Sequence, residues 1–189
     1  MISSSKFYSV LNSLLRKGLV KEHNVNLGGR GGSAKYVELT DAGFEAIDMQ
    51  PRSHLTLGGN FITDLFVSKI SKHLKKMKQN WKISIEKQIQ GKFMDIVIEP
   101  INQSLIIAIE IELSDANLKN NIDNDINKVN FLIVACGNKD ILKKAEEIKN
   151  NLLEQSQNKI GICLLTQLLK CQKLTDVIDS EIVLKTKDI

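Results

Sequence analysis

The chain has 189 residues, of which 42% are hydrophobic and 25% charged, and its formal net charge is +4. This composition is typical of a folded protein. The net charge is small, so any binding of nucleic acid has to come from local basic patches and not from the overall charge of the protein. No apolar run reaches the roughly 18 residues of a membrane span, and the first residues lack the apolar core of a signal peptide. We therefore expect a cytoplasmic protein without a membrane partner.

The cysteines and histidines give no indication of a zinc or nucleophilic site. Cys136, Cys163 and Cys171 show no CxxC spacing, and two of them lie in apolar, strand-like runs, so we expect reduced residues that contribute to packing. The three histidines are scattered, and no serine or cysteine has a plausible histidine partner beside it. Any catalytic site therefore depends on other side chains.

The N-terminal part of the chain predicts a helix, a hairpin and a second helix. Residues 3–16 begin with serines that can cap a helix, carry an apolar stripe at helical spacing, and are followed by the stop signal Gly18. Two alternating runs about a glycine-rich tip at residues 27–33 predict a β-hairpin. Thr40 is a suitable N-cap for a short helix that extends to Ile47.

This order over about residues 3–48 resembles the second half of a winged-helix DNA-binding domain. The resemblance implies that the first helix is the recognition helix and that Gly28 to Ser33 form the wing, with Arg30 and Lys35 as DNA contacts. The sequence has no counterpart of the helices that precede the recognition helix in that family. Either the chain is the C-terminal part of a longer protein, or the hairpin is a docking element. A glycine-rich hairpin tip without a ligand is the alternative interpretation of the wing.

A linker is predicted at residues 49–59, which contain a proline and two glycines without a clear period. It separates the N-terminal segment, residues 1–48, from a second domain, residues 60–189. That domain begins with an apolar stripe typical of a helix, with lysines on the other faces. Lys72 and Lys76 are candidate contacts to a DNA backbone, and a solvated helix face is the alternative.

The rest of the second domain alternates between strands and helices. This order predicts an α/β fold with a mixed central sheet flanked by helices. The main elements are expected as strands 82–89, 92–99 and 104–113, helix 115–127, strand 130–136, helix 138–155 and strand 160–165. After them we expect a last helix over residues 168–178 and a short strand over residues 181–184.

Three acidic residues lie in the second and third of these strands. Side chains alternate between the faces of a strand, so Glu110 and Glu112 share one face, and Asp95 can join them from the neighbouring antiparallel strand. Three converging carboxylates repel one another without a cation, and hard oxygen ligands favour Mg²⁺ or Mn²⁺ over zinc. The alternative is the wet face of an antiparallel sheet. Ala108 and Val97 on the same face favour a covered site.

An Asp on the second strand and Glu-x-Glu on the third, within the element order of residues 60–165, resemble the PD-(D/E)xK nuclease superfamily. The resemblance implies a restriction-endonuclease-like fold and metal-dependent DNA phosphodiester hydrolysis. Asp95 and Glu110 would be the metal ligands, and Glu112 would take the position that is usually lysine and act as general base. The proline that normally precedes the motif Asp is replaced by Met94.

Other residues near these strands are candidates for supporting roles. Glu86 is a candidate further metal ligand, with an exposed strand end as the alternative. The missing lysine could be replaced by Lys119, Lys87 or Lys92, and Lys119 is also a candidate DNA contact. Asn121 on the following helix could bind a phosphate or a ligand carboxylate, or face solvent.

A second function stays open beside hydrolysis, namely a catalytically inactive nuclease-fold module for DNA binding or assembly. Residues 107–135 are similar to accessory segments of plasmid-mobilisation proteins and of DNA-translocating ATPases. This likeness implies DNA and a DNA-translocating ATPase as partners. Since many nucleases of the superfamily act as dimers, a homodimer is a further expectation.

Overall fold

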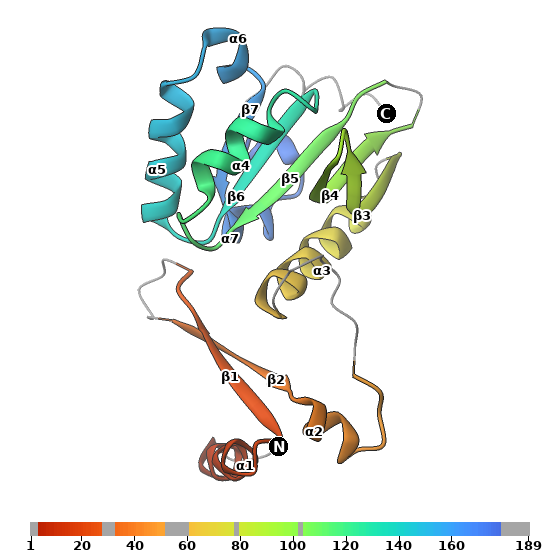
Figure 1. Cartoon of the computed structure of the whole chain (residues 1–189), viewed down its shortest axis with the longest axis vertical. Helices are drawn as coiled ribbons and strands as arrows, with labels where there is room; N and C mark the ends of the chain where they lie inside the picture. The colour runs from red at the N-terminus through yellow and green to blue at the C-terminus, as the bar shows by residue number, and fades with distance from the viewer. Residues whose placement is uncertain (1–3, 28–32, 52–60, 78–79, 102–103, 179–189) are drawn as a thin grey trace.

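The computed structural model describes residues 4–27, 33–51, 61–77, 80–101 and 104–178 (Figure 1). Its N-terminal part contains helix α1, a two-stranded antiparallel hairpin and helix α2, as the sequence predicts. The predicted wing residues 28–32, and with them Arg30, lie outside the described residues. The elements are α1 (Ser4–Arg16), β1 (Val20–Val25), β2 (Ala34–Leu39) and α2 (Asp41–Glu45).

Local signals explain where these N-terminal elements begin and end. Gly18 ends the α1 region with a φ of 66°, a left-handed conformation that glycine adopts without strain. The Thr40 hydroxyl accepts a hydrogen bond from the Gly43 amide and donates one to the Gly18 carbonyl oxygen, at 3.1 and 2.7 Å. Thr40 therefore caps α2 and also attaches it to the end of the α1 region.

The second part is a five-stranded mixed sheet flanked by helices, in the strand order β3-β4-β5-β6-β7. β3, β4 and β5 form an antiparallel meander, and β6 and β7 continue it in parallel. The elements are α3 (Phe61–Lys76), β3 (Trp81–Ile89), β4 (Lys92–Pro100), β5 (Ile107–Glu112), α4 (Leu118–Asp125), β6 (Phe131–Cys136), α5 (Lys139–Asn150), α6 (Glu154–Gln157), β7 (Ile160–Leu164), α7 (Leu165–Leu168) and the 3₁₀ turn Leu174–Asp176.

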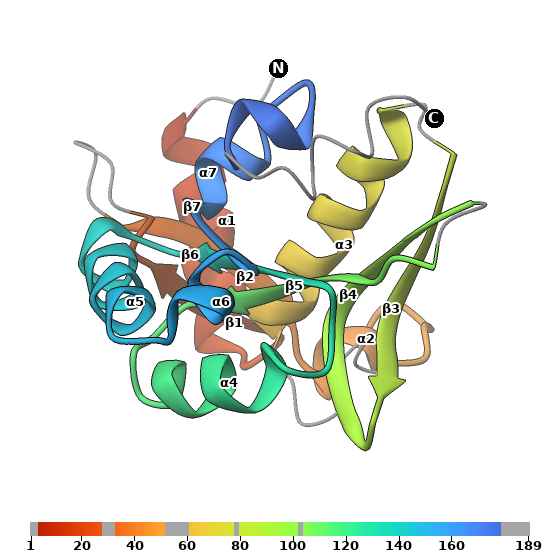
Figure 2. The ribbon, with the colours of Figure 1, turned by 90° about the horizontal axis from the view of Figure 1, so that it is seen from above.

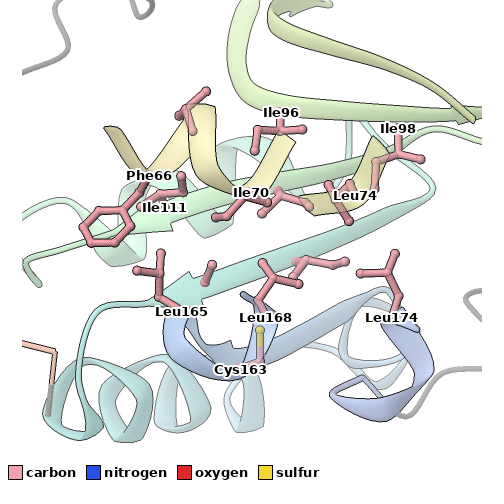
Figure 3. Packing of buried hydrophobic residues seen from close by; sticks show 14 of the residues in the cluster. Phe66, Ile70, Leu74, Ile96, Ile98, Ile111, Cys163, Leu165, Leu168 and Leu174 are labelled. Atoms are coloured by element: carbon pink, nitrogen blue, oxygen red, sulfur yellow. The ribbon is translucent and has the colours of Figure 1, made fainter. Parts of the chain in front are cut away.

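Helices cover both faces of this sheet (Figure 2). On one face, α3 and α7 pack over the odd-numbered isoleucines of β5, and Figure 3 shows Phe66, Ile70 and Leu74 of α3 in this core. On the other face, α4 and α5 pack over Ala108 of β5. Every residue of β5 and of β6 is buried as a result. The side chains of β5 that face α4 are therefore interior groups.

The N-terminal hairpin contacts helix α3. The rings of Tyr36 and Phe66 meet edge to face with centroids 5.9 Å apart, and the Lys69 ammonium lies 5.0 Å from the Tyr36 ring centroid. On β1, the His23 ring lies 5.1 Å from that of Phe61. Aromatic and cation–π contacts thus attach the hairpin to α3, and Tyr36 packs against the core that α3 forms with the sheet.

Several predicted details need correction. The predicted helix over residues 168–178 is wrong, because α7 ends at Leu168 and only a 3₁₀ turn follows. The predicted helix over residues 138–155 is divided into α5 and the short α6. The predicted strand over residues 181–184 lies outside the described residues. All three cysteines are free and buried, which confirms their packing role.

No helix in the part of the chain that the structure describes has both the length and the apolar character needed to cross a membrane.

Candidate functional site

Asp95 and Glu110 lie side by side where the β4–β5 ladder ends. The register pairs Ile96 with Ile109, which makes Asp95 and Glu110 the next cross-strand neighbours. The Asp95 amide donates to Glu110 Oε1 at 3.3 Å, and the Ile111 amide donates to Asp95 Oδ2 at 2.9 Å. At this position the backbone amides of Asp95 and Ile111 thus donate to side-chain carboxylates instead of to carbonyl oxygens of the opposite strand. The structure confirms the predicted approach of Asp95 to Glu110.

Glu112 occupies the same face of β5, under helix α4. Glu110 and Glu112 are each only 7% exposed. Glu112 Oε1 accepts a hydrogen bond of 2.8 Å from the side-chain amide of Asn121 on α4. Leu118 of α4 packs in the same core as Ala108 of β5. The alternative interpretation, in which both glutamates point into solvent, is therefore wrong.

Burial is the main electrostatic feature of this group. It raises the pKa of Asp95 to about 6, against an opposing hydrogen bond from the Ile111 amide. Burial raises the pKa of Glu110 well above its ordinary value, and the nearby Asp95 carboxylate adds to the rise. The pKa of Glu112 is also raised by burial, and the bond from Asn121 partly offsets that. These carboxylates are held close together with too little positive charge to stabilise their ionised forms.

Glu86 lies opposite Asp95 on the neighbouring strand. The β3–β4 register pairs Ile85 with Ile96 and Lys87 with Met94, and it skips the position between them, where Glu86 has a φ of 51°. Glu86 Oε2 is buried and has no hydrogen-bond partner among the described residues. The charge of Glu86 contributes to the raised pKa of Asp95. Glu86 is therefore a half-buried neighbour of the cluster, inside a strand.

Helix α4 adds a group that the sequence analysis missed, the carboxylate of Asp125. Asp125 is 0% exposed, and neither of its oxygens has a hydrogen-bond partner among the described residues. Lys92 Nζ lies 3.7 Å from Asp125 Oδ2 and donates to Asn121 Oδ1 at 3.3 Å. Asp125 follows Leu118 and Ile122 on the buried face of α4. The signal that could have identified Asp125 is its spacing from Leu118 and Ile122, which places an acidic residue in the apolar stripe of the helix.

The three lysines predicted to replace the motif lysine have different partners. Lys87 pairs with Glu99 at 2.5 Å, and Lys119 pairs with Asp123 one turn along α4. Lys92, in contrast, lowers the pKa values of Asp95, Glu110 and Glu112. Of the three, it is Lys92 that the structure places at the carboxylates.

The predicted DNA contacts are not gathered around the carboxylates. Lys72 and Lys76 are exposed on α3, which covers the other face of the sheet (Figure 2). Lys35 lies on the hairpin and pairs with Glu22 at 2.9 Å. Lys119 is exposed on α4, on the same side of the sheet as the cluster. Any contact of one DNA molecule with all of these lysines would have to extend around the sheet.

The donor set of Asp95, Glu110 and Glu112 suits a hard cation such as Mg²⁺ or Mn²⁺, because all donors are carboxylate oxygens. Asp95 and Glu110 each use one oxygen for a backbone amide and keep a second that accepts no hydrogen bond from a described residue. The donors fit the metal in kind. They do not form a ready coordination shell, since no group of three His, Cys, Asp or Glu among the described residues is arranged to hold a metal.

Two open cavities among the described residues lie near the end of β5 and between α4 and α5. One of about 240 Å³ follows the end of β5 and is lined by residues that include Ser114, Asp115 and Asn138. Another of about 420 Å³ lies between α4 and α5 and includes Lys119 and Glu147. Neither is lined by the buried carboxylates.

No family model, no curated protein and no solved structure matches this chain.

Proposed function

We propose that this protein hydrolyses DNA phosphodiester bonds with a divalent cation bound at Asp95 and Glu110, and with Glu112 as the general base. The observation that carries the proposal is the position of these three carboxylates on one face of two adjacent central strands, where Glu110 and Glu112 are buried, Asp95 is half-buried, and all three pKa values are raised. Burying several ionised carboxylates together is unfavourable in free energy, and carboxylates with strongly shifted pKa values are typical of functional sites. A bound cation would offset the repulsion between them.

The topology supports a restriction-endonuclease-like fold for this proposal. A helix, a three-stranded antiparallel meander, a helix and a parallel strand follow one another from α3 to β6. This is the element order on which the resemblance to PD-(D/E)xK nucleases was based. Asp95 on the second strand and Glu110 on the third lie side by side, as that motif requires of metal ligands.

Each carboxylate has a distinct role in this mechanism. Asp95 and Glu110 would hold Mg²⁺ or Mn²⁺, which supplies Lewis acidity at the scissile phosphate and lowers the pKa of a bound water. The Glu112 side chain is oriented by Asn121 through one oxygen, so the other can accept the proton of the attacking water. Its raised pKa makes Glu112 a stronger base than an exposed glutamate. Glu86 would be a further oxygen ligand.

Replacing Glu112 by Gln should slow cleavage while metal binding is retained. The amide can still accept the bond from Asn121 but cannot take a proton, so we expect kcat to fall by about 10²- to 10⁴-fold, the usual contribution of a general base. Cleavage of supercoiled, linear and single-stranded DNA in Mg²⁺ or Mn²⁺ measures this effect. Equal rates for Glu112→Gln and the wild type would remove Glu112 from the mechanism.

The second candidate function is a module that binds DNA or assembles with a DNA-translocating ATPase without cleaving DNA. The observation that favours it is the absence, among described residues, of a ready three-residue metal group. Salt-dependent DNA binding by the wild type, with no hydrolysis in Mg²⁺ or Mn²⁺, would support this function and contradict the nuclease. If the chain, as a monomer or as a homodimer, showed no affinity for DNA, the assembly role would be favoured instead.

A further inference from the structure

The ion pair between Lys92 and Asp125 is the most unusual contact outside the carboxylate cluster itself. Asp125 is fully buried, and its nearest described cation is the Lys92 ammonium at 3.7 Å. An ionised carboxylate in the interior is costly unless a cation accompanies it. Asp125 therefore fixes the position of Lys92 Nζ. The Lys92 side chain keeps 31% of its surface exposed, so it is open to a ligand on the side away from Asp125.

Asn121 connects this ion pair to the proposed general base. Its side-chain oxygen accepts from Lys92 Nζ at 3.3 Å, and its side-chain nitrogen donates to Glu112 Oε1 at 2.8 Å. Asn121 and Asp125 are four residues apart on α4 and so lie on one face of the helix. A single helix face thus holds both Lys92 and Glu112.

The backbone brings Lys92 to this place through a tight turn. Gln90 and Gly91 have φ values of 48° and 83°, the pattern of a type I′ hairpin turn. Lys92 is the first residue of β4 after this turn and pairs with Ile89. The closed end of the β3–β4 hairpin extends on the side of the sheet where α4 lies (Figure 2).

We propose that Lys92 is the cationic residue of this site, and that its ammonium contacts a non-bridging oxygen of the scissile phosphate. Asp125 and Asn121 are the positioning residues that hold it there. This inference rests on the proposed function. Lys92 stabilises the charge that builds on the phosphate during hydrolysis and transfers no proton. Lys92, at the start of β4, thus supplies the positive charge that is missing on β5, where Glu112 takes the position that is usually lysine.

The test compares Lys92→Met with Lys87→Met in the full chain. Lys87 is a suitable control because its side chain is 30% exposed on the neighbouring strand and pairs with Glu99 instead. We expect Lys92→Met to lower kcat by about 10²- to 10³-fold, as for other groups that stabilise developing charge. Lys87→Met should leave kcat unchanged. Mn²⁺ should bind to Lys92→Met at least as tightly as to the wild type, since a positive charge beside the carboxylates has been removed.

A double variant separates contact with the substrate from simple neutralisation of Asp125. Lys92→Met leaves the buried Asp125 carboxylate alone and so could slow cleavage by disturbing the fold. Lys92→Met/Asp125→Leu removes both charges and should restore the melting temperature. If Lys92 only neutralises Asp125, the double variant also regains the wild-type kcat, and the inference is overturned. If Lys92 contacts the phosphate, the double variant stays as slow as Lys92→Met.

Failure of this inference is distinguishable from failure of the proposed function. A wild-type protein that cleaves no DNA in Mg²⁺ or Mn²⁺ overturns the proposed function, and with it the role of Lys92. A Lys92→Met variant that cleaves as fast as a cleaving wild type overturns the role of Lys92 alone.

Discussion

Asp95→Asn is expected to abolish DNA cleavage and, without metal, to make the protein more stable. Asp95 would lose its role as a metal ligand, so we expect cleavage to fall by about 10³-fold or more. The amide oxygen of Asn can still accept from the Ile111 amide, so the backbone contact is kept. A neutral group also removes the burial cost of the charge. With a pKa raised to about 6, that cost is up to about 3 kcal/mol at pH 8.

The measurement combines a cleavage assay with thermal unfolding in EDTA at pH 8. A gain of about 3 kcal/mol would raise the melting temperature by roughly 6–12 °C in a protein of this size. Asp123→Asn is the matched control, because Asp123 is an exposed acid of α4 that pairs with Lys119. Loss of an exposed pair should change stability by less than about 1 kcal/mol. Unchanged cleavage together with a lower melting temperature for Asp95→Asn would contradict the account.

The stability of the metal-free protein is expected to fall as the pH rises through the slightly acidic range. Below about pH 4, Asp95 is protonated in the folded and the unfolded chain, so it contributes no difference. Between about pH 4 and 6 the unfolded chain loses this proton while the folded chain keeps it, which lowers the free energy of unfolding. Glu110 and Glu112 act in the same direction, because burial raises their pKa values as well.

Urea denaturation of the wild type and of Asp95→Asn/Glu110→Gln, from pH 4.5 to 8 in EDTA, isolates this effect. The other titrating groups are common to both proteins, so the difference between their free energies of unfolding reports the two carboxylates. We expect the variant's advantage to grow by about 2 kcal/mol across this range from Asp95, with Glu110 adding to it in the same direction. Mn²⁺ at pH 7.5 should reverse the wild type's loss, because it binds the ionised form. Parallel pH profiles for the two proteins would contradict the raised pKa values.

The sheet and its acidic residues could be predicted because they depend on local patterns. Alternation along β5 put Glu110 and Glu112 on one face, and Gly91 marked the turn that sets the β3–β4 register. The antiparallel meander then brought Asp95 next to Glu110. Ala108 and Val97 indicated correctly that this face is covered.

The surroundings of the cluster depend on contacts between distant segments and were not predictable in the same way. The partner of Asp125 is 33 residues away along the chain, at the tip of a hairpin, and nothing in the local sequence of α4 specifies it. Which face of the sheet a helix covers depends on its connections. The lysines of α3 therefore lie on the opposite face of the sheet from the carboxylates, a placement that their spacing along the helix does not specify.

Titration of Mn²⁺ into the wild type and into Asp95→Asn by calorimetry at pH 7.5 tests the central claim most directly. We predict that the wild type binds Mn²⁺, that Asp123→Asn binds it equally well, and that Asp95→Asn binds it at least about tenfold more weakly. Equal binding by the wild type and Asp95→Asn, or no binding by either, would contradict a metal site at Asp95 and Glu110.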